Sequence, residues 1–186
     1  MRELSLHVLD IAENSISAGA SLVEIEIEED SGQGVLSITI TDDGKGMTEE
    51  QVKQVIDPFY TTRKTRKVGL GIPLFKMAAE MTGGTFSITS EPGLGTKIST
   101  RFLLSSVDLI PLGDINATIS LLIRCNPDRD FLYRRKKDSR SFTLETRQLR
   151  EVLGNEVSLA SNDVMQWIDE FLKEQTQIIF GGANLE

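Results

Sequence analysis

Four polar residues near the N-terminus are spaced so that they could act together. His7, Asp10, Asn14 and Ser17 follow one another at intervals of three, four and three residues, which places them on one side of an α-helix. A solvent-facing stripe is the usual explanation of such a pattern. This helix has little other polar surface, however, and a carboxylate one turn from an amide favours a functional site.

Asp42 is a second candidate for chemistry because it falls on the apolar side of a strand. In residues 36–41 every second side chain is leucine or isoleucine, and continuing this alternation turns Asp42 inward. An inward carboxylate is costly unless it is paired or hydrogen-bonded. Gly44 and Gly46 follow it and permit a close backbone approach. A β-turn with a solvated aspartate is the alternative, and the inward parity argues against it.

The segment 57–72 has the composition of a phosphate-binding lid. It begins with a rigid apolar Pro-Phe pair at 58–59, four of the five residues 63–67 are basic, and Gly69 and Gly71 lie just before a helix. Glycines let backbone N–H groups turn toward an anion, and a helix N-terminus adds positive potential there. An ordinary surface loop is the alternative interpretation.

Hydrophobic periodicity predicts the elements that position these residues. We expect helices over 4–18 and 48–55, and strands over 23–28, 36–41, 85–89 and 97–103, the last two forming a hairpin. A further amphipathic helix should follow the lid and end at Gly83, with an apolar face made of Leu74, Met77, Ala78 and Met81.

Composition excludes several classes of protein. The 186 residues carry a net charge of −8, which argues against a protein that binds nucleic acid through its phosphates. Cys125 is the single cysteine, so no intrachain disulfide can form and a reducing cytoplasm is expected. No stretch has the length and apolarity of a signal core or a membrane span, and neither GxxxxGK[ST] nor GxGxxG occurs.

Five short motifs appear in a characteristic order: 10–14 (Asp-Ile-Ala-Glu-Asn), 42–46 (Asp-Asp-Gly-Lys-Gly), 57–59 (Asp-Pro-Phe), 69–71 (Gly-Leu-Gly) and 93–96 (Gly-Leu-Gly-Thr). Together they resemble the N, G1, F, G2 and G3 boxes of the GHKL ATPase superfamily, which includes gyrase B, heat-shock chaperones, histidine kinases and MutL. The resemblance covers residues 4–104. The short lid is most similar to that of a histidine kinase, whereas residues 13–20 look more like MutL.

The resemblance implies a fold and a domain division. It implies an α/β (α+β) two-layer sandwich of the Bergerat type, with helices on one face of a mixed sheet and ATP bound between helix and lid. Residues 1–104 would form this ATP-binding domain, 105–180 a small C-terminal α+β module for a partner, and 181–186 a flexible tail.

The resemblance also implies roles for individual residues. Asn14 would coordinate Mg²⁺, Asp42 would accept a hydrogen bond from the adenine amino group, and Asp10 would position or deprotonate water. The remaining expected ATP-binding residues are Gly44, Gly46 and Met47 near the base, Thr96 beside Asp42, and Thr62, Lys67, Gly69, Leu70 and Gly71 near the phosphates.

Three departures from the family pattern bear on function. Asp10 stands where the superfamily usually has glutamate, and it is one C–C bond, about 1.5 Å, shorter. Ser17 matches neither the lysine common in kinases nor the aspartate of MutL and gyrase. The helical hairpin that carries a histidine kinase's phosphoacceptor is not found, so we expect no autophosphorylation in cis. His7 should therefore tune Asp10 or pack against the fold.

The resemblance to the family ends at residue 104. Asp114 should cap a helix, and strands near 131–133 and 141–144 should form a hairpin whose turn, 134–138, is basic. Two more helices should follow, the second carrying Trp167 and Phe171 on its apolar face. The basic turn could bind an acidic partner, although a solvated loop is the commoner explanation. The layout weakly resembles uncharacterised bacterial ATP-binding proteins with a partner-binding module.

Two functions fit these observations. The first is a signalling kinase that uses Mg·ATP to phosphorylate a partner protein in trans. The second is a switch in which ATP orders the lid and the C-terminal module for a partner, with slow or no hydrolysis. Either function implies an unidentified protein partner and allows a homodimer, and neither implies a membrane or a nucleic acid.

Overall fold

The computed structural model describes residues 3–58, 71–154 and 156–181. Most of the predicted lid lies outside the described residues, including the expected phosphate-binding residues Thr62, Lys67, Gly69 and Leu70. Within the described ranges the helices are α1 (Leu4–Ser17), α2 (Glu49–Val55), α3 (Gly71–Met81), α4 (Ile115–Cys125), α5 (Thr146–Leu153) and α6 (Asn162–Ile179). The strands are β1 (Leu22–Asp30), β2 (Val35–Asp42), β3 (Thr85–Glu91), β4 (Gly95–Leu103), β5 (Asp130–Lys137) and β6 (Arg140–Glu145).

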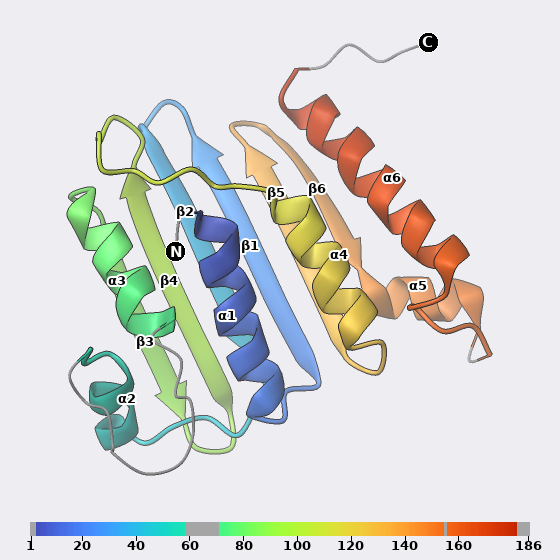
Figure 1. Ribbon diagram of the computed structural model, residues 1–186, viewed down its shortest axis with the longest axis horizontal. Helices are drawn as coiled ribbons and strands as arrows, with labels where there is room; N and C mark the ends of the chain where they lie inside the picture. The colour runs from blue at the N-terminus through green and yellow to red at the C-terminus, as the bar shows by residue number, and fades with distance from the viewer. Residues whose placement is uncertain (1–2, 59–70, 155, 182–186) are drawn as a thin grey trace.

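The strands form one mixed sheet in the order β3-β4-β2-β1-β5-β6 (Figure 1). Neighbouring strands run antiparallel except β1 and β5, which are parallel. The C-terminal segment therefore adds two strands to the sheet that the first 104 residues build.

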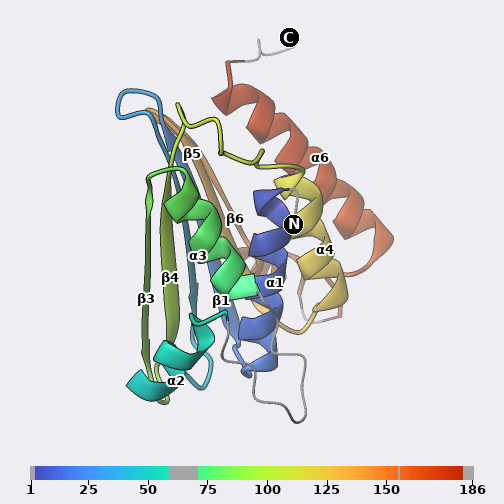
Figure 2. The same ribbon diagram turned by 60° about the vertical axis from the view of Figure 1, so that its left-hand side comes forward.

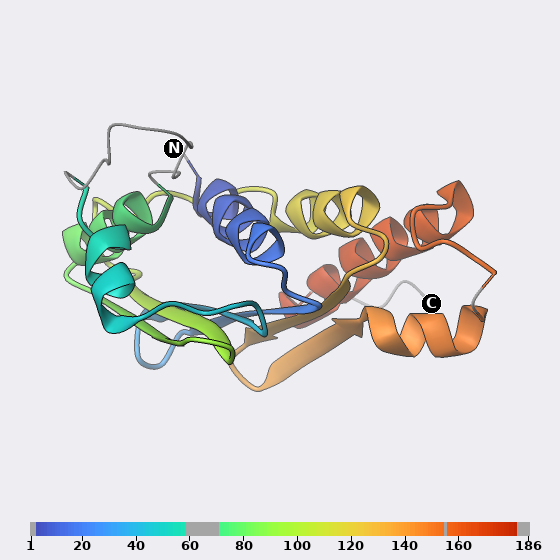
Figure 3. The ribbon, with the colours of Figure 1, turned by 90° about the horizontal axis from the view of Figure 1, so that it is seen from below.

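The helices α1, α3, α4 and α6 lie on one side of this sheet, and none of the described helices covers its other face (Figures 2 and 3). The covered face is aliphatic: Ile25, Ile27, Ile38, Ile40 and Ile98 are all buried beneath the helices. The open face carries the alternating polar residues, among them Thr39 and Ser99, whose hydroxyl oxygens lie 3.1 Å apart. This arrangement confirms the predicted two-layer α/β sandwich.

Local side-chain caps explain where two of the helices begin. Before α2, the Gln51 N–H donates to Thr48 Oγ1 (3.3 Å), and the Thr48 N–H donates back to Gln51 Oε1 (2.9 Å), which is a capping box. Before α4, the Ala117 N–H donates to Asp114 Oδ1 at 2.9 Å. The predicted cap at Asp114 is confirmed.

The predicted apolar face of α3 is wrong at its two methionines, although Ala78 packs against the core as predicted. Met77 and Met81 are 44% and 57% exposed, whereas Phe75 and Ala79 are fully buried. The Phe75 ring packs between His7 and Phe102, at ring-centroid distances of 5.5 and 5.7 Å. Because the large ring fills the space between α1 and the sheet, the helix turns its methionines outward.

The predicted basic turn at 134–138 is also wrong. Arg134, Lys136 and Lys137 lie in β5, opposite Glu26, Glu28 and Glu29 of β1, and each pair forms a salt bridge. Opposite charges on neighbouring strands stabilise the pairing. Sequence reading missed this because the stabilising glutamates lie more than a hundred residues earlier, as the separation of 108 between Arg134 and Glu26 shows.

Candidate functional site

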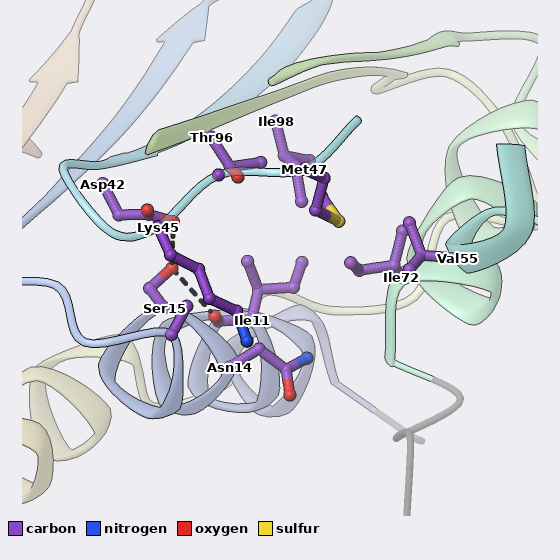
Figure 4. Close-up of a pocket in the computed structure, with 12 residues that line it drawn as sticks. Ile11, Asn14, Ser15, Asp42, Lys45, Met47, Val55, Ile72, Thr96 and Ile98 are labelled. Carbon is purple, nitrogen blue, oxygen red and sulfur yellow. Dashed lines mark hydrogen bonds between the residues drawn. The ribbon is translucent and has the colours of Figure 1, made fainter. Parts of the chain in front are cut away.

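A cavity of about 200 Å³ opens between the C-terminal half of α1 and the loop that follows β2 (Figure 4). Its polar members are Asn14, Ser15, Asp42, Lys45 and Thr96. Its apolar wall is supplied by Ile11, Ala18, Met47, Val55, Ile72 and Ile98, and Gly46 completes the lining. An apolar slot with a few convergent polar groups is the usual form of a small-molecule site.

Asp42 lies at the wall of this cavity with its carboxylate held in place. The Ser15 hydroxyl donates to Oδ2 at 2.6 Å, and the Gly44 N–H donates to Oδ1 at 2.9 Å. The register of β2 and β4 sets Thr96 directly opposite Asp42, so the two side chains share one face of the sheet. The prediction that Asp42 faces the apolar side of its strand is confirmed. Each oxygen of the carboxylate can still accept another hydrogen bond.

Hydrogen bonds fix the loop 43–47 to residues 18–22, which follow α1, and to the turn between β3 and β4. Asp43 Oδ1 accepts from the N–H groups of Ser21 (2.7 Å) and Leu22 (2.9 Å). Burial alone would raise the pKa of Asp43, but these hydrogen bonds outweigh it and hold the pKa below its usual value. Lys45 N–H donates to the Ala18 carbonyl at 3.0 Å, and Gly93 N–H donates to the Lys45 carbonyl at 2.7 Å.

Position 46 requires glycine because the backbone at the end of β3 lies too close to leave room for a side chain. Its φ is +65°, and a Cβ at this position would lie 1.8 Å from the Glu91 carbonyl oxygen. A side chain would therefore force two backbone segments apart. The next residue, Met47, donates its N–H to Ser90 Oγ at 2.8 Å, which ties the cavity floor to β3.

Asp10 does not line the cavity but lies where α3 begins. A Cβ on Gly71 would stand 2.8 Å from Asp10 Oδ2, so glycine is what lets the carboxylate pack against the first residue of α3. Asp10 therefore lies against the first residue of the helix that follows the predicted lid.

His7 is buried rather than part of a polar stripe. It is 2% exposed and stacks on Phe75 across the α1–α3 contact. Burial lowers its pKa, against the opposing effects of a hydrogen bond to the Gly71 backbone and the charge of Asp10. Of the two roles that we expected for His7, this geometry agrees with that of a packed residue.

The structure brings together about half of the predicted site. Asn14, Asp42, Gly46, Met47 and Thr96 line the cavity, Gly44 supports Asp42 from behind, and Asp10 and Gly71 touch each other outside it. Sequence reasoning missed Ser15, Lys45 and the aliphatic wall. Ile11, Ser15 and Ala18 follow one another at helical spacing and could have been found from Asn14. Figure 4 shows Lys45 reaching toward α1 beside Asn14, and no sequence signal indicated this.

The oxygen atoms at the cavity edge fit the way in which proteins bind Mg²⁺. This ion usually binds one or two side-chain oxygens and takes its other ligands from water and substrate phosphates. Asn14 offers an exposed amide at the rim. The described part of the chain has no cluster of three or more His, Cys, Asp or Glu residues. The described residues would therefore not surround a metal ion with protein ligands alone.

Comparison with known proteins identifies relatives of the first part of the chain. Residues 2–106 match the family model of histidine kinase-, DNA gyrase B- and HSP90-like ATPases. The sensor histidine kinase ZraS of Klebsiella oxytoca is 38% identical over 64 residues, 34% of this chain and 14% of the relative. YkoH of Bacillus subtilis, also a sensor histidine kinase, is 30% identical over 97 residues, 50% of this chain and 21% of the relative.

A third relative matches over a longer stretch. The histidine protein kinase DivJ of Caulobacter vibrioides is 28% identical over 104 residues, 54% of this chain and 17% of the relative. The matched part of this chain thus spans between 14% and 21% of the length of these three kinases. In the described residues no helix is both long and apolar enough to cross a membrane.

Proposed function

Because the chain belongs to the family of histidine kinase-, DNA gyrase B- and HSP90-like ATPases, we propose that it binds Mg·ATP in the cavity beside α1. In this proposal it transfers the γ-phosphoryl group to a partner protein in trans and releases ADP. The relatives named as sensor histidine kinases support the kinase class.

The observation that carries the proposal is the oriented carboxylate of Asp42. Ser15 and Gly44 fix it at the wall of an apolar slot, where it can accept from the exocyclic amino group of adenine. Guanine presents a carbonyl oxygen at the corresponding position, which would face the carboxylate as a second acceptor. The aliphatic residues Ile11, Ile72 and Ile98 would contact the faces of the base.

The phosphate end of the nucleotide would lie toward the start of α3. When bound there, Mg²⁺ supplies charge neutralisation at the phosphate oxygens. Asn14 would hold the ion through its amide oxygen, and Lys45, which reaches toward α1 beside Asn14 in Figure 4, would offset negative charge. Asp10, packed on Gly71, would orient the attacking group or accept its proton.

A specific observation favours a second function, an ATP-dependent switch with slow or no hydrolysis. Asp10 is short and does not line the cavity, and misplacement of about 1 Å can cost roughly a hundredfold in rate. In this alternative, Asp10 couples nucleotide binding to the position of α3 rather than activating a nucleophile.

Incubation of the protein with γ-labelled ATP and cell extract separates the two functions. A kinase yields a labelled protein other than itself, and Asp42→Asn abolishes the labelling. Free phosphate, or ATP bound and recovered intact, supports the switch. The cytoplasmic location, the partner and a homodimer stay predictions.

A further inference from the structure

The first turn of α3 forms one wall of the candidate nucleotide cavity. Ile72, the second residue of this helix, lines the cavity and points into it (Figure 4). The helix α1 lies beside α3 on the same face of the sheet (Figures 1 and 2). Any contact that fixes the first turn of α3 against α1 therefore also fixes this wall.

His7 of α1 contacts the first turn of α3 at two points. Its ring stacks on Phe75, with centroids 5.5 Å apart and ring planes at 26°, and it forms a hydrogen bond with the Gly71 backbone. Burial lowers the pKa of His7, whereas this bond raises it. A bond that favours the charged ring is one in which the ring N–H donates to a backbone carbonyl. The two contacts precede and follow Ile72 along the helix.

The nitrogen of His7 that makes this bond is Nε2. The side chain is 2% exposed, and Nδ1 has no hydrogen-bond partner among the residues that the structure describes. A buried polar atom without a partner is uncommon in folded proteins. Packing alone does not require an imidazole here, because a phenyl ring could stack on Phe75 without burying an unpaired nitrogen. What the imidazole adds is the bond from Nε2 to Gly71.

Asp10 lies against the same glycine, one helical turn after His7. A Cβ on Gly71 would stand 2.8 Å from Asp10 Oδ2, so the position of Gly71 determines how the carboxylate lies relative to α3. A shift of Gly71 away from His7 would move the N–H groups at the N-terminus of α3 and change their distance from Asp10. These are the groups that would face the nucleotide phosphates in the proposed function.

We propose that His7 is a positioning residue for the phosphate end of the nucleotide site, holding the first turn of α3 in place through Nε2. This inference rests on the proposed function. The adenine end is fixed separately, by Ser15 and Asp42. His7 should therefore control how much the β- and γ-phosphates add to binding. A bond can bias the position of α3 by no more than its own free energy, about 1 kcal/mol for a neutral bond, which limits the effect to roughly fivefold.

Calorimetric titration of the full chain with Mg·ATP and with AMP tests this role. The ratio of the two affinities isolates the contribution of the β- and γ-phosphates, because a change at the base, including one at Ile72, affects both ligands. His7→Phe keeps a ring that can stack on Phe75 but removes the bond, and should lower the ratio about fivefold. His7→Gln loses the ring but can place an amide N–H near the position of Nε2, and should retain most of the ratio.

His7→Asn is the matched control for His7→Gln. It also lacks the ring, but its shorter side chain reaches only the position of Nδ1, so it should lower the ratio as His7→Phe does. This pair decides the matter if His7→Phe does not fold. A ratio that is unchanged in the Phe and Asn variants, or that falls equally in the Gln and Asn variants, would overturn the inference while ATP binding stands. Wild-type protein that binds neither nucleotide would refute the proposed function and the role of His7 with it.

Discussion

Ser15 determines how firmly the carboxylate of Asp42 is held. Its hydroxyl, 2.6 Å from Asp42 Oδ2, joins α1 to the end of β2. Ser15 is buried between the two elements. The nucleotide specificity proposed for Asp42 therefore depends on a residue of the neighbouring helix.

Ser15→Ala should weaken ATP binding by about 1 kcal/mol, the contribution of one hydrogen bond. Asp42 would keep the Gly44 N–H but lose the donor that fixes its second oxygen. Equilibrium dialysis with labelled ATP measures the change. Ser87→Ala on the exposed side of β3 is the control, and equal affinities for both variants would show that Ser15 does not support the site.

Asp10 distinguishes the kinase from the switch. If it acts as a base, Asp10→Asn should lower turnover by roughly 10²–10⁴ with little change in ATP affinity, and Asp10→Glu should raise turnover by restoring reach. Asn14→Ala should instead weaken Mg·ATP binding itself. Steady-state turnover and nucleotide Kd for the three variants measure these effects. Full turnover in Asp10→Asn would remove the catalytic role.

Among the elements, α5 is anchored to the sheet through Asp130. This carboxylate accepts from Arg147 Nε and Arg150 Nε, both at 3.0 Å, and from Thr146 Oγ1 at 3.1 Å. Burial alone would raise the pKa of Asp130, but the hydrogen bonds from both arginines and Thr146 outweigh it and lower the pKa. Folding therefore favours the ionised form of Asp130.

Asp130→Asn should destabilise the fold by about 1.5–3 kcal/mol at neutral pH, as expected for charge-assisted hydrogen bonds. Because the folded pKa is depressed, this contribution is complete above the ordinary value of 3.8 and is lost as pH falls through the folded pKa. Urea unfolding at several pH values, with the exposed Asp128→Asn as control, measures it. A stability difference that stays constant down to the lowest pH would contradict this account.

The sequence predicts elements well where their signal is local. The alternation in β2 oriented Asp42 correctly, and the cap at Asp114 located the start of α4. The burial of Phe75 in place of Met77, and the assignment of the basic residues to β5, depend on neighbours distant in the sequence. For the same reason Ile98 escaped notice as a site residue, since only the packing of α1 onto the sheet brings it to the cavity.

At the scale of the molecule, one sheet and one core join the two parts of the chain. The candidate nucleotide cavity lies where α1 ends and β2 carries Asp42. The C-terminal strands β5 and β6 complete the same sheet, and buried residues of both parts, among them Ile38 and Tyr133, belong to one hydrophobic core.

Nucleotide-dependent stabilisation tests the central claim most directly. Thermal unfolding should be compared for the wild type and Asp42→Asn, each without nucleotide, with Mg·ATP and with Mg·GTP. At about 100 times its Kd, ATP should stabilise the wild type by about 2.7 kcal/mol, GTP far less, and Asp42→Asn should lose most of the difference between them. Equal stabilisation by ATP and GTP, or an ATP response undiminished in Asp42→Asn, would contradict the proposed adenine site.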